Sequence, residues 1–184
     1  MAETLVASPA LRLPGAHHGA PGTGLRIALY TPDSMASLAA AAGQSAALAA
    51  ALATALGWAL PDTPRREGNV LWAGPQRWLV LDPPPDLAER AGTLGSVTDQ
   101  SDSRVLLRLS GARLRDTLGK GVPVDLHPHA FAVDALALTL AWHIAVLLWR
   151  DSAQTMVLGC ARSYARDLLA QLLEAGAEYG IACD

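Results

Sequence analysis

Four polar side chains near the middle of the chain have the types needed for nucleophilic or acid–base chemistry. Asp99, Ser101 and Asp102 are close together in sequence, and His127 follows downstream. A hydroxyl, carboxylates and an imidazole could form one catalytic group if the fold brought them together. The pattern Asp-x-Ser-Asp before a strand also has a structural interpretation, because such side chains commonly bond to the backbone of their own turn. The sequence favours the turn.

The other histidines and the two cysteines form no recognisable metal or catalytic site. His17-His18 stands in a glycine-rich segment without the third and fourth ligands of a metal site. We expect His143 at a turn or satisfied in the core rather than in catalysis. Cys160 and Cys183 lack a CxxC spacing and are expected to be buried or tail thiols. We therefore assign no catalytic, cofactor-binding or metal-binding residue.

Known motifs and charge exclude several classes of function. The sequence has no G-x-G-x-x-G after a strand, no phosphate-binding loop, no G-x-S-x-G and no H-E-x-x-H, so no motif indicates a cofactor. A net charge of -3 and the absence of lysine runs argue against nucleic-acid binding. The N-terminus lacks a basic segment followed by an apolar core, and cysteines are few, which indicates the cytoplasm.

The central stretch 96–128 predicts a strand followed by a helix. Val105, Leu107 and Leu109 alternate within an almost wholly apolar run, which is typical of a buried strand. After Ser110-Gly111 the apolar residues no longer alternate, and their spacing becomes that of a helix.

The helix of this stretch is expected to begin at Ala112. Leu114 and Leu118 lie four apart, which places them on one helical face. Gly119 and Gly121 are expected to close the helix, because glycine adopts a left-handed C-terminal cap without steric cost.

The N-terminal half contains an arm, a strand, an alanine-rich tract and a helix. Residues 1–23 lack periodicity and are expected to form an extended or mobile arm. A strand is expected over 25–30, and a helix over 45–56, ended by Gly57. For 35–42, alanine content favours helix, whereas the alternation of its residues also fits a short strand.

Two apolar runs around a Gly-Pro pair predict a β-hairpin at 70–81. The hairpin carries Trp72, Arg77 and Trp78. The indoles have two interpretations: core residues, which strand aromatics usually are, or anchors of a partner surface, since tryptophan is enriched in binding hot spots. We name Trp72, Arg77 and Trp78 as candidate partner contacts, with Arg77 placed to pair with a partner carboxylate.

The C-terminal third predicts further strands and an amphipathic helix. The run 135–149 is too short to span a bilayer and contains a histidine, so we expect two strands joined by a bend at Trp142-His143. A last strand is expected at 155–158. The helix 161–174 places Tyr164 and several leucines on its apolar side.

Together these elements predict an α+β fold with antiparallel or mixed sheets and helices packed on their faces, because the strict βαβ rhythm is absent. The chain has 184 residues, 51% of them hydrophobic, enough for a sizeable core. We expect residues 24–184 to form a single domain. A division into two subdomains, if present, would fall near residue 92.

Four segments, in order, resemble the gamma subunit of heterotetrameric sarcosine oxidase. They are VLWAGPQRWLVL, VTDQSDSRVLLRLSGARLRDTLGKGVPVDLHPHAF, LTLAWHIAVLLWR and CARSYARDLLAQLL. The resemblance covers about residues 46–180. Its most specific parts are the Trp-x-Gly-Pro-x-x-Trp hairpin, the Asp-Leu-His-Pro after a Lys-Gly pair, and the Arg-Ser-Tyr-Ala before the last helix.

The resemblance implies a fold similar to the folate-binding domain of glycine-cleavage aminomethyltransferase, and it makes residues 35–42 a strand. It also implies a complex in which a beta subunit holds flavin and oxidises sarcosine. An alpha subunit would bind nicotinamide (NAD) and folate, and a delta subunit would bind zinc. The products would be glycine, hydrogen peroxide and formaldehyde, or methylene-tetrahydrofolate when folate is present.

Two departures limit what the resemblance carries over. Gamma subunits commonly have a cysteine after the Lys-Gly pair, where this chain has Val122. Aminomethyltransferases carry a glycine-rich turn followed by acidic residues where this chain has Ala141-Trp142-His143. Neither thiol chemistry nor aminomethyl transfer can therefore be assigned to a residue here.

Two functions follow as hypotheses. The first is a non-catalytic structural subunit that docks on the alpha subunit of a sarcosine oxidase complex, with the cofactors held by the partner subunits. The second is a stand-alone folate-binding carrier or repair protein of the aminomethyltransferase group.

Overall fold

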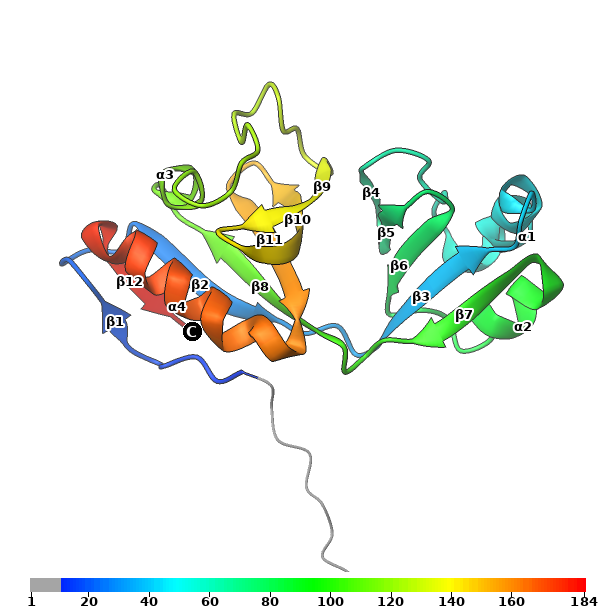
Figure 1. Ribbon diagram of the computed structural model, residues 1–184, viewed down its shortest axis with the longest axis horizontal. Coiled ribbons are helices and arrows are strands. Elements are labelled where there is room, and N and C mark those ends of the chain that lie inside the picture. The colour runs from blue at the N-terminus through cyan, green and yellow to red at the C-terminus, as the bar shows by residue number, and fades with distance from the viewer. Residues whose placement is uncertain (1–10) are drawn as a thin grey trace, which may run out of the picture.

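The computed structural model describes residues 11–184, and their strands form two sheets with helices on the faces turned away from each other (Figure 1). This is the predicted α+β class. All strand pairs are antiparallel except β12 with β2.

The larger sheet has seven strands among the described residues, in the order β1-β12-β2-β8-β11-β10-β9. Their bounds are β1 His17–His18, β2 Leu25–Tyr30, β8 Arg104–Ser110, β9 Leu136–Ala141, β10 Ile144–Ser152, β11 Thr155–Ala161 and β12 Ile181–Cys183.

The smaller sheet has five strands among residues 11–184, in the order β4-β5-β6-β3-β7. Their bounds are β3 Met35–Ala40, β4 Arg66–Glu67, β5 Val70–Gly74, β6 Arg77–Leu81 and β7 Gly95–Asp99. The helices are α1 Ser45–Leu56, α2 Leu87–Ala91, α3 Leu114–Leu118 and α4 Ala165–Gly176, with 3-10 turns η1 Gly92–Leu94, η2 Arg162–Tyr164 and η3 Ala177–Tyr179.

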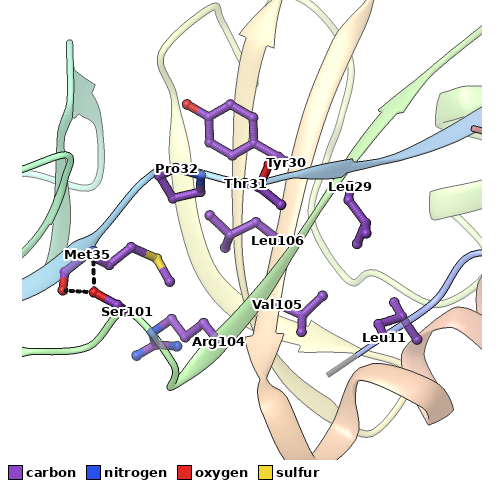
Figure 2. A pocket seen from close by; sticks show the side chains of 10 residues that line it. All are labelled: Leu11, Leu29, Tyr30, Thr31, Pro32, Met35, Ser101, Arg104, Val105 and Leu106. Carbon is purple, nitrogen blue, oxygen red and sulfur yellow. Dashed lines mark hydrogen bonds between the residues drawn. The ribbon is translucent and has the colours of Figure 1, made fainter. Parts of the chain in front are cut away.

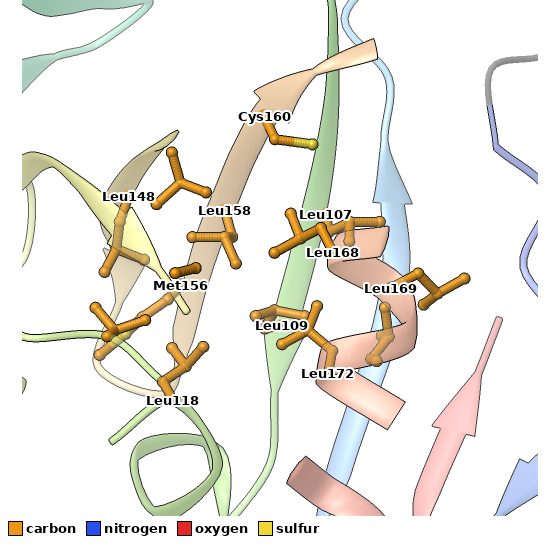
Figure 3. Packing of buried hydrophobic residues seen from close by; sticks show 14 of the residues in the cluster. Leu107, Leu109, Leu118, Leu148, Met156, Leu158, Cys160, Leu168, Leu169 and Leu172 are labelled. Carbon is orange, nitrogen blue, oxygen red and sulfur yellow. The ribbon is translucent and has the colours of Figure 1, made fainter. Parts of the chain in front are cut away.

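Three apolar clusters hold these layers together. The first joins the larger sheet to α3 and α4, and Figure 3 shows alternate residues of β8 and β11 facing the leucines of α4. The second lies between the two sheets, with Trp149, Leu71 and Leu81 almost fully buried. The third joins the smaller sheet to α1 and α2. The sheets therefore share one interior, and burial of this apolar surface drives the fold.

The two sheets are interleaved in sequence, so the division of the chain differs from the predicted one. The whole smaller sheet lies within residues 35–99, and the larger sheet takes strands from both sides of this insertion. The chain crosses between the sheets twice, at 31–34 and 100–103, rather than dividing near residue 92 (Figure 1).

The described part of the predicted N-terminal arm is integrated in the larger sheet. Leu11 is buried in the first cluster, and His17 and His18 pair with Ala182 and Ile181 of β12. Short pairing of this kind needs no periodic pattern, which is why the composition of the segment did not indicate it. Residues 1–10 lie outside the described residues.

Strand β3 confirms the assignment that the resemblance implied for the alanine-rich tract. It pairs with β6 on one side and β7 on the other. Both ladders satisfy its backbone, and this tertiary pairing outweighs the helix propensity of alanine. Helix α1 follows as predicted, with Leu48 and Leu52 buried and Gly57 in a left-handed C-cap at φ 67°.

Helix α3 ends differently from the expectation. Gly119 has a right-handed φ of -60°, so the predicted left-handed cap is wrong. Gly121 instead permits a close approach, because a Cβ there would lie 2.3 Å from the indole of Trp142. The Gly121 carbonyl accepts the Trp142 N–H at 2.6 Å, and Trp142 has a φ of 55°. The Lys120-Gly121 segment therefore packs against the β9–β10 turn.

Helix α4 begins later than predicted, and this changes the position of Tyr164. Leu168, Leu169 and Leu172 are buried as expected. Tyr164 is 52% exposed, because it belongs to the 3-10 turn η2, where the helical period does not yet apply.

Candidate partner interface

Asp99 and Ser101 form the turn that the sequence favoured. Asp99 Oδ1 accepts bonds from the Ser101 backbone N–H at 2.9 Å and the Ser101 hydroxyl at 2.6 Å. These bonds, the hydroxyl first, hold the pKa of Asp99 below its usual value. Ser101 Oγ also accepts a hydrogen bond from the Met35 backbone N–H, at 3.1 Å. This bond connects the two segments that cross between the sheets (Figure 2).

The remaining members of the candidate catalytic group lie in other environments. Asp102 is almost fully exposed and pairs with Arg162 at 3.1 Å. His127 stacks on His129 with ring centroids 5.1 Å apart, and its backbone N–H donates to Asp125. No hydrogen bond or ring contact among the described residues joins His127 to the Asp99 turn.

The thiols and the other histidines also occupy structural positions. Burial raises the pKa of Cys160 to about 11 and also raises the pKa of Cys183, so both thiols are protonated at neutral pH. His143 is exposed at the β9–β10 turn, as expected. Within residues 11–184, no three His, Cys, Asp or Glu side chains are grouped to hold a metal ion. No helix of this part of the chain is long and apolar enough to cross a membrane.

The predicted hairpin exists as β5 and β6, with Trp72 opposite Trp78. Trp78 is only 5% exposed, and its indole N–H donates to the Pro61 carbonyl at 2.7 Å, so it is a core residue of this chain. Trp72 is half-buried beside the intersheet cluster. Arg77 is exposed. Contact of Trp72 or Arg77 with a partner stays a prediction, and the free chain offers almost no Trp78 surface for one.

An apolar groove opens at the edge of the intersheet core, close to β9. We call it the intersheet groove; its volume is about 460 Å³, and it is lined by Ala73, Leu79, Arg104, Leu138, Thr139, Leu140, Ala145, Val146 and Leu147. Leu138 and Leu140 are 48% and 47% exposed. Exposed apolar side chains beside an apolar hollow are typical of a docking surface.

Arg104 separates this groove from a second, smaller hollow of about 220 Å³ beside the crossings, where Figure 2 shows it near Met35 and Val105. On the neighbouring strand β11, Arg104 is paired with Ala161. The guanidinium forms no ion pair with another described residue.

The sequence did not reveal this groove. Residues 135–149 predicted two buried strands, but β9 is an edge strand whose burial alternates. Leu138 and Leu140 are separated by Thr139, an alternation that would place the leucines on the covered face, whereas in the structure the two leucines are the exposed residues.

Comparison with known proteins places these features in a family. The sequence matches the family "Sarcosine oxidase, gamma subunit family" over residues 36–178. It is 36% identical over 118 residues to the sarcosine oxidase subunit gamma of Corynebacterium sp. (strain P-1), covering 60% of this chain and 57% of that protein. It is 43% identical over 93 residues to that of Arthrobacter sp., covering 47% and 45%. The chain thus spans about half the length of these relatives.

Comparison with solved structures points to the same family. A chain of the heterotetrameric sarcosine oxidase from Corynebacterium sp. U-96, in complex with pyrrole 2-carboxylate, matches with a TM-score of 0.75 and 30% identity over 88% of each chain. Aminomethyltransferase T of the glycine cleavage system from Bartonella henselae shares the fold, with a TM-score of 0.57 at 14% identity over 88% of this chain and 48% of that one. The chain therefore belongs to the sarcosine oxidase gamma subunit family.

Proposed function

We propose that this chain is a non-catalytic structural subunit of a heterotetrameric sarcosine oxidase and that it docks on the alpha subunit. The observation that carries the proposal is the match, over 88% of both chains, to a chain of a heterotetrameric sarcosine oxidase. In such a complex, sarcosine is oxidatively demethylated to glycine, with hydrogen peroxide and formaldehyde or methylene-tetrahydrofolate as the other products.

The roles of the polar residues support a structural rather than a chemical function. The hydroxyl and carboxylate best suited to catalysis are engaged in a turn, and both thiols are buried and protonated. We therefore propose that flavin, NAD, folate and zinc are held by the alpha, beta and delta subunits. The two free buried cysteines also suit a reducing compartment, and we propose the cytoplasm.

Co-purification tests this function. When an affinity-tagged form of this chain is produced together with the alpha, beta and delta subunits encoded in the same genome, all four should elute as one complex, measured by native mass spectrometry. The tagged chain produced alone serves as the control, and it should show neither flavin absorbance nor sarcosine-dependent peroxide formation. A tagged chain that elutes alone from the four-subunit preparation would contradict the proposal.

The alternative, a stand-alone folate-binding carrier or repair protein, has the shared aminomethyltransferase fold in its favour. Against it, Trp142 packs on Gly121 at a turn that carries no carboxylate. We expect calorimetry with tetrahydrofolate to detect weak binding or none. Micromolar affinity, about 8 kcal/mol, would favour the alternative.

A further inference from the structure

The free edge of the larger sheet at β9 has backbone groups available for another strand. Ala141 and Ile144 close a two-residue turn and form a hydrogen-bonded pair. Since the pairing alternates, Thr139 bonds inward to Val146, whereas the N–H and C=O of Leu138 and Leu140 point away from β10. These outward groups lie beside the intersheet groove.

The chain itself covers only the beginning of this edge. The Leu136 N–H donates to the Pro64 carbonyl at 3.2 Å, and Ala135 forms a bridge with Arg65. The uncovered part therefore starts after Leu136 and contains Leu138 and Leu140. Both side chains are about half exposed and line the groove.

The other sheet edges of the described chain are protected, and β9 is not. Edge strands commonly avoid unwanted pairing by being short or by carrying charges or proline. Strand β1 has two residues, β4 is the charged pair Arg66–Glu67, and β7 is a polar strand that ends with Asp99. Strand β9 is LALTLA, with six residues and no charge or proline. An unguarded apolar edge in a soluble complex is expected to be covered by a partner.

Charge indicates what kind of partner fits. The guanidinium of Arg104 lines the groove and forms no ion pair with a described residue. A second copy of this chain, pairing β9 with β9, would bring no carboxylate on that strand. A segment with an acidic side chain would complement Arg104, whereas a homodimer would not.

We propose that β9 is the docking strand of this subunit and accepts an extended segment of a partner subunit as an added strand. The segment has apolar side chains at alternate positions, which enter the intersheet groove beside Leu138 and Leu140. Beyond the residues paired with β9, it crosses the groove and brings a carboxylate to Arg104, which lies on β8 with β11 and β10 between it and β9. Main-chain bonds supply affinity and the alternate side chains supply specificity, as in other cases of strand addition. This inference rests on the proposed function, because it names the surface through which the subunit docks.

Substitutions at β9 test the inference in the assembled four-subunit complex. Leu138→Pro removes an N–H that points outward, so the pairing with β10 is retained, and proline is tolerated at such edge positions. Leu140→Glu places a charge in the groove. It is the second test variant, and it keeps the inference testable if the proline variant fails to fold. Each should weaken binding to the other subunits about ten-fold or more. Val133→Glu is the matched control, since Val133 is 47% exposed and does not line the groove; it should bind normally.

Two further readouts make the result specific. Hydrogen exchange should show new protection of the Leu138 and Leu140 amides on assembly, with none at the β7 edge. Arg104→Glu should weaken binding to the other subunits more than Arg104→Ala does. A higher salt concentration should reduce the difference in affinity between these two variants. Wild-type chain that fails to assemble would refute the proposed function itself. The strand-addition inference alone would be overturned if the wild-type chain assembles and both Leu138→Pro and Leu140→Glu bind with unchanged affinity. A free homodimer that Leu138→Pro dissociates would also overturn that inference.

Discussion

Replacing Trp78 by alanine distinguishes a core residue from a partner anchor. The indole is 5% exposed among Leu48, Leu52 and Val80, and truncating a buried tryptophan costs about 3–5 kcal/mol of the free energy of unfolding. The Pro61 carbonyl, which accepts the indole N–H at 2.7 Å, also loses its donor, at a cost of about 1 kcal/mol. For a chain of this size the melting temperature should fall by roughly 8–24 °C.

The assay is chemical and thermal unfolding of the free chain, with co-purification measured below the melting temperature of the variant. Trp58→Ala is the control, because Trp58 is 51% exposed and its loss should cost about 1 kcal/mol or less. We expect Trp78→Ala to be much less stable but still to bind its partners when folded. Unchanged stability together with lost co-purification would refute the core assignment.

Three other substitutions or treatments have expected outcomes. Gly121→Ala should lower the free energy of unfolding by about 1–3 kcal/mol, because its Cβ would meet the Trp142 ring at 2.3 Å; an unchanged urea midpoint would contradict this. Arg150→Met should cost about 2–4 kcal/mol, since the buried guanidinium donates to the carbonyls of Phe131, Ser152 and Ala153, which would lose their donor; a midpoint equal to wild type would count against it. The thiols of Cys160 and Cys183 should resist a thiol reagent near pH 8 until denaturant is added, because burial raises both pKa values and the reactive thiolate is scarce below them; rapid labelling of the native chain would show that the thiols are accessible.

Elements with a strong local period could be predicted from sequence, and those decided by distant pairing could not. The leucines of α1 and α4 and the alternation of β8 indicate their structures directly. Strand β3 needed the family resemblance, because its alanines favour helix and only pairing with β6 and β7 decides otherwise. The interleaving of the two sheets and the small strand β1 depend on long-range pairs that leave no periodic signal.

The candidate site shows the same limit. The turn at Asp99 and Ser101 was predictable, because both residue types bond to nearby backbone. Aromatic content drew attention to Trp72 and Trp78, but side-chain type does not say which face of a hairpin is covered. The exposure of Leu138 and Leu140 follows from the place of β9 at the end of the sheet order, and this place is a property of the whole topology.

The most direct test of the central claim, that this subunit acts by docking and not by chemistry, is sarcosine-dependent peroxide formation per assembled complex. Complexes would carry this chain with Ser101→Ala, Asp102→Asn, His127→Ala or His143→Ala, one substitution at a time, and assembly would be quantified by native mass spectrometry. Turnover per assembled complex should equal that of wild type in every case. A variant that assembles fully but loses turnover would contradict the claim and place chemistry on this chain.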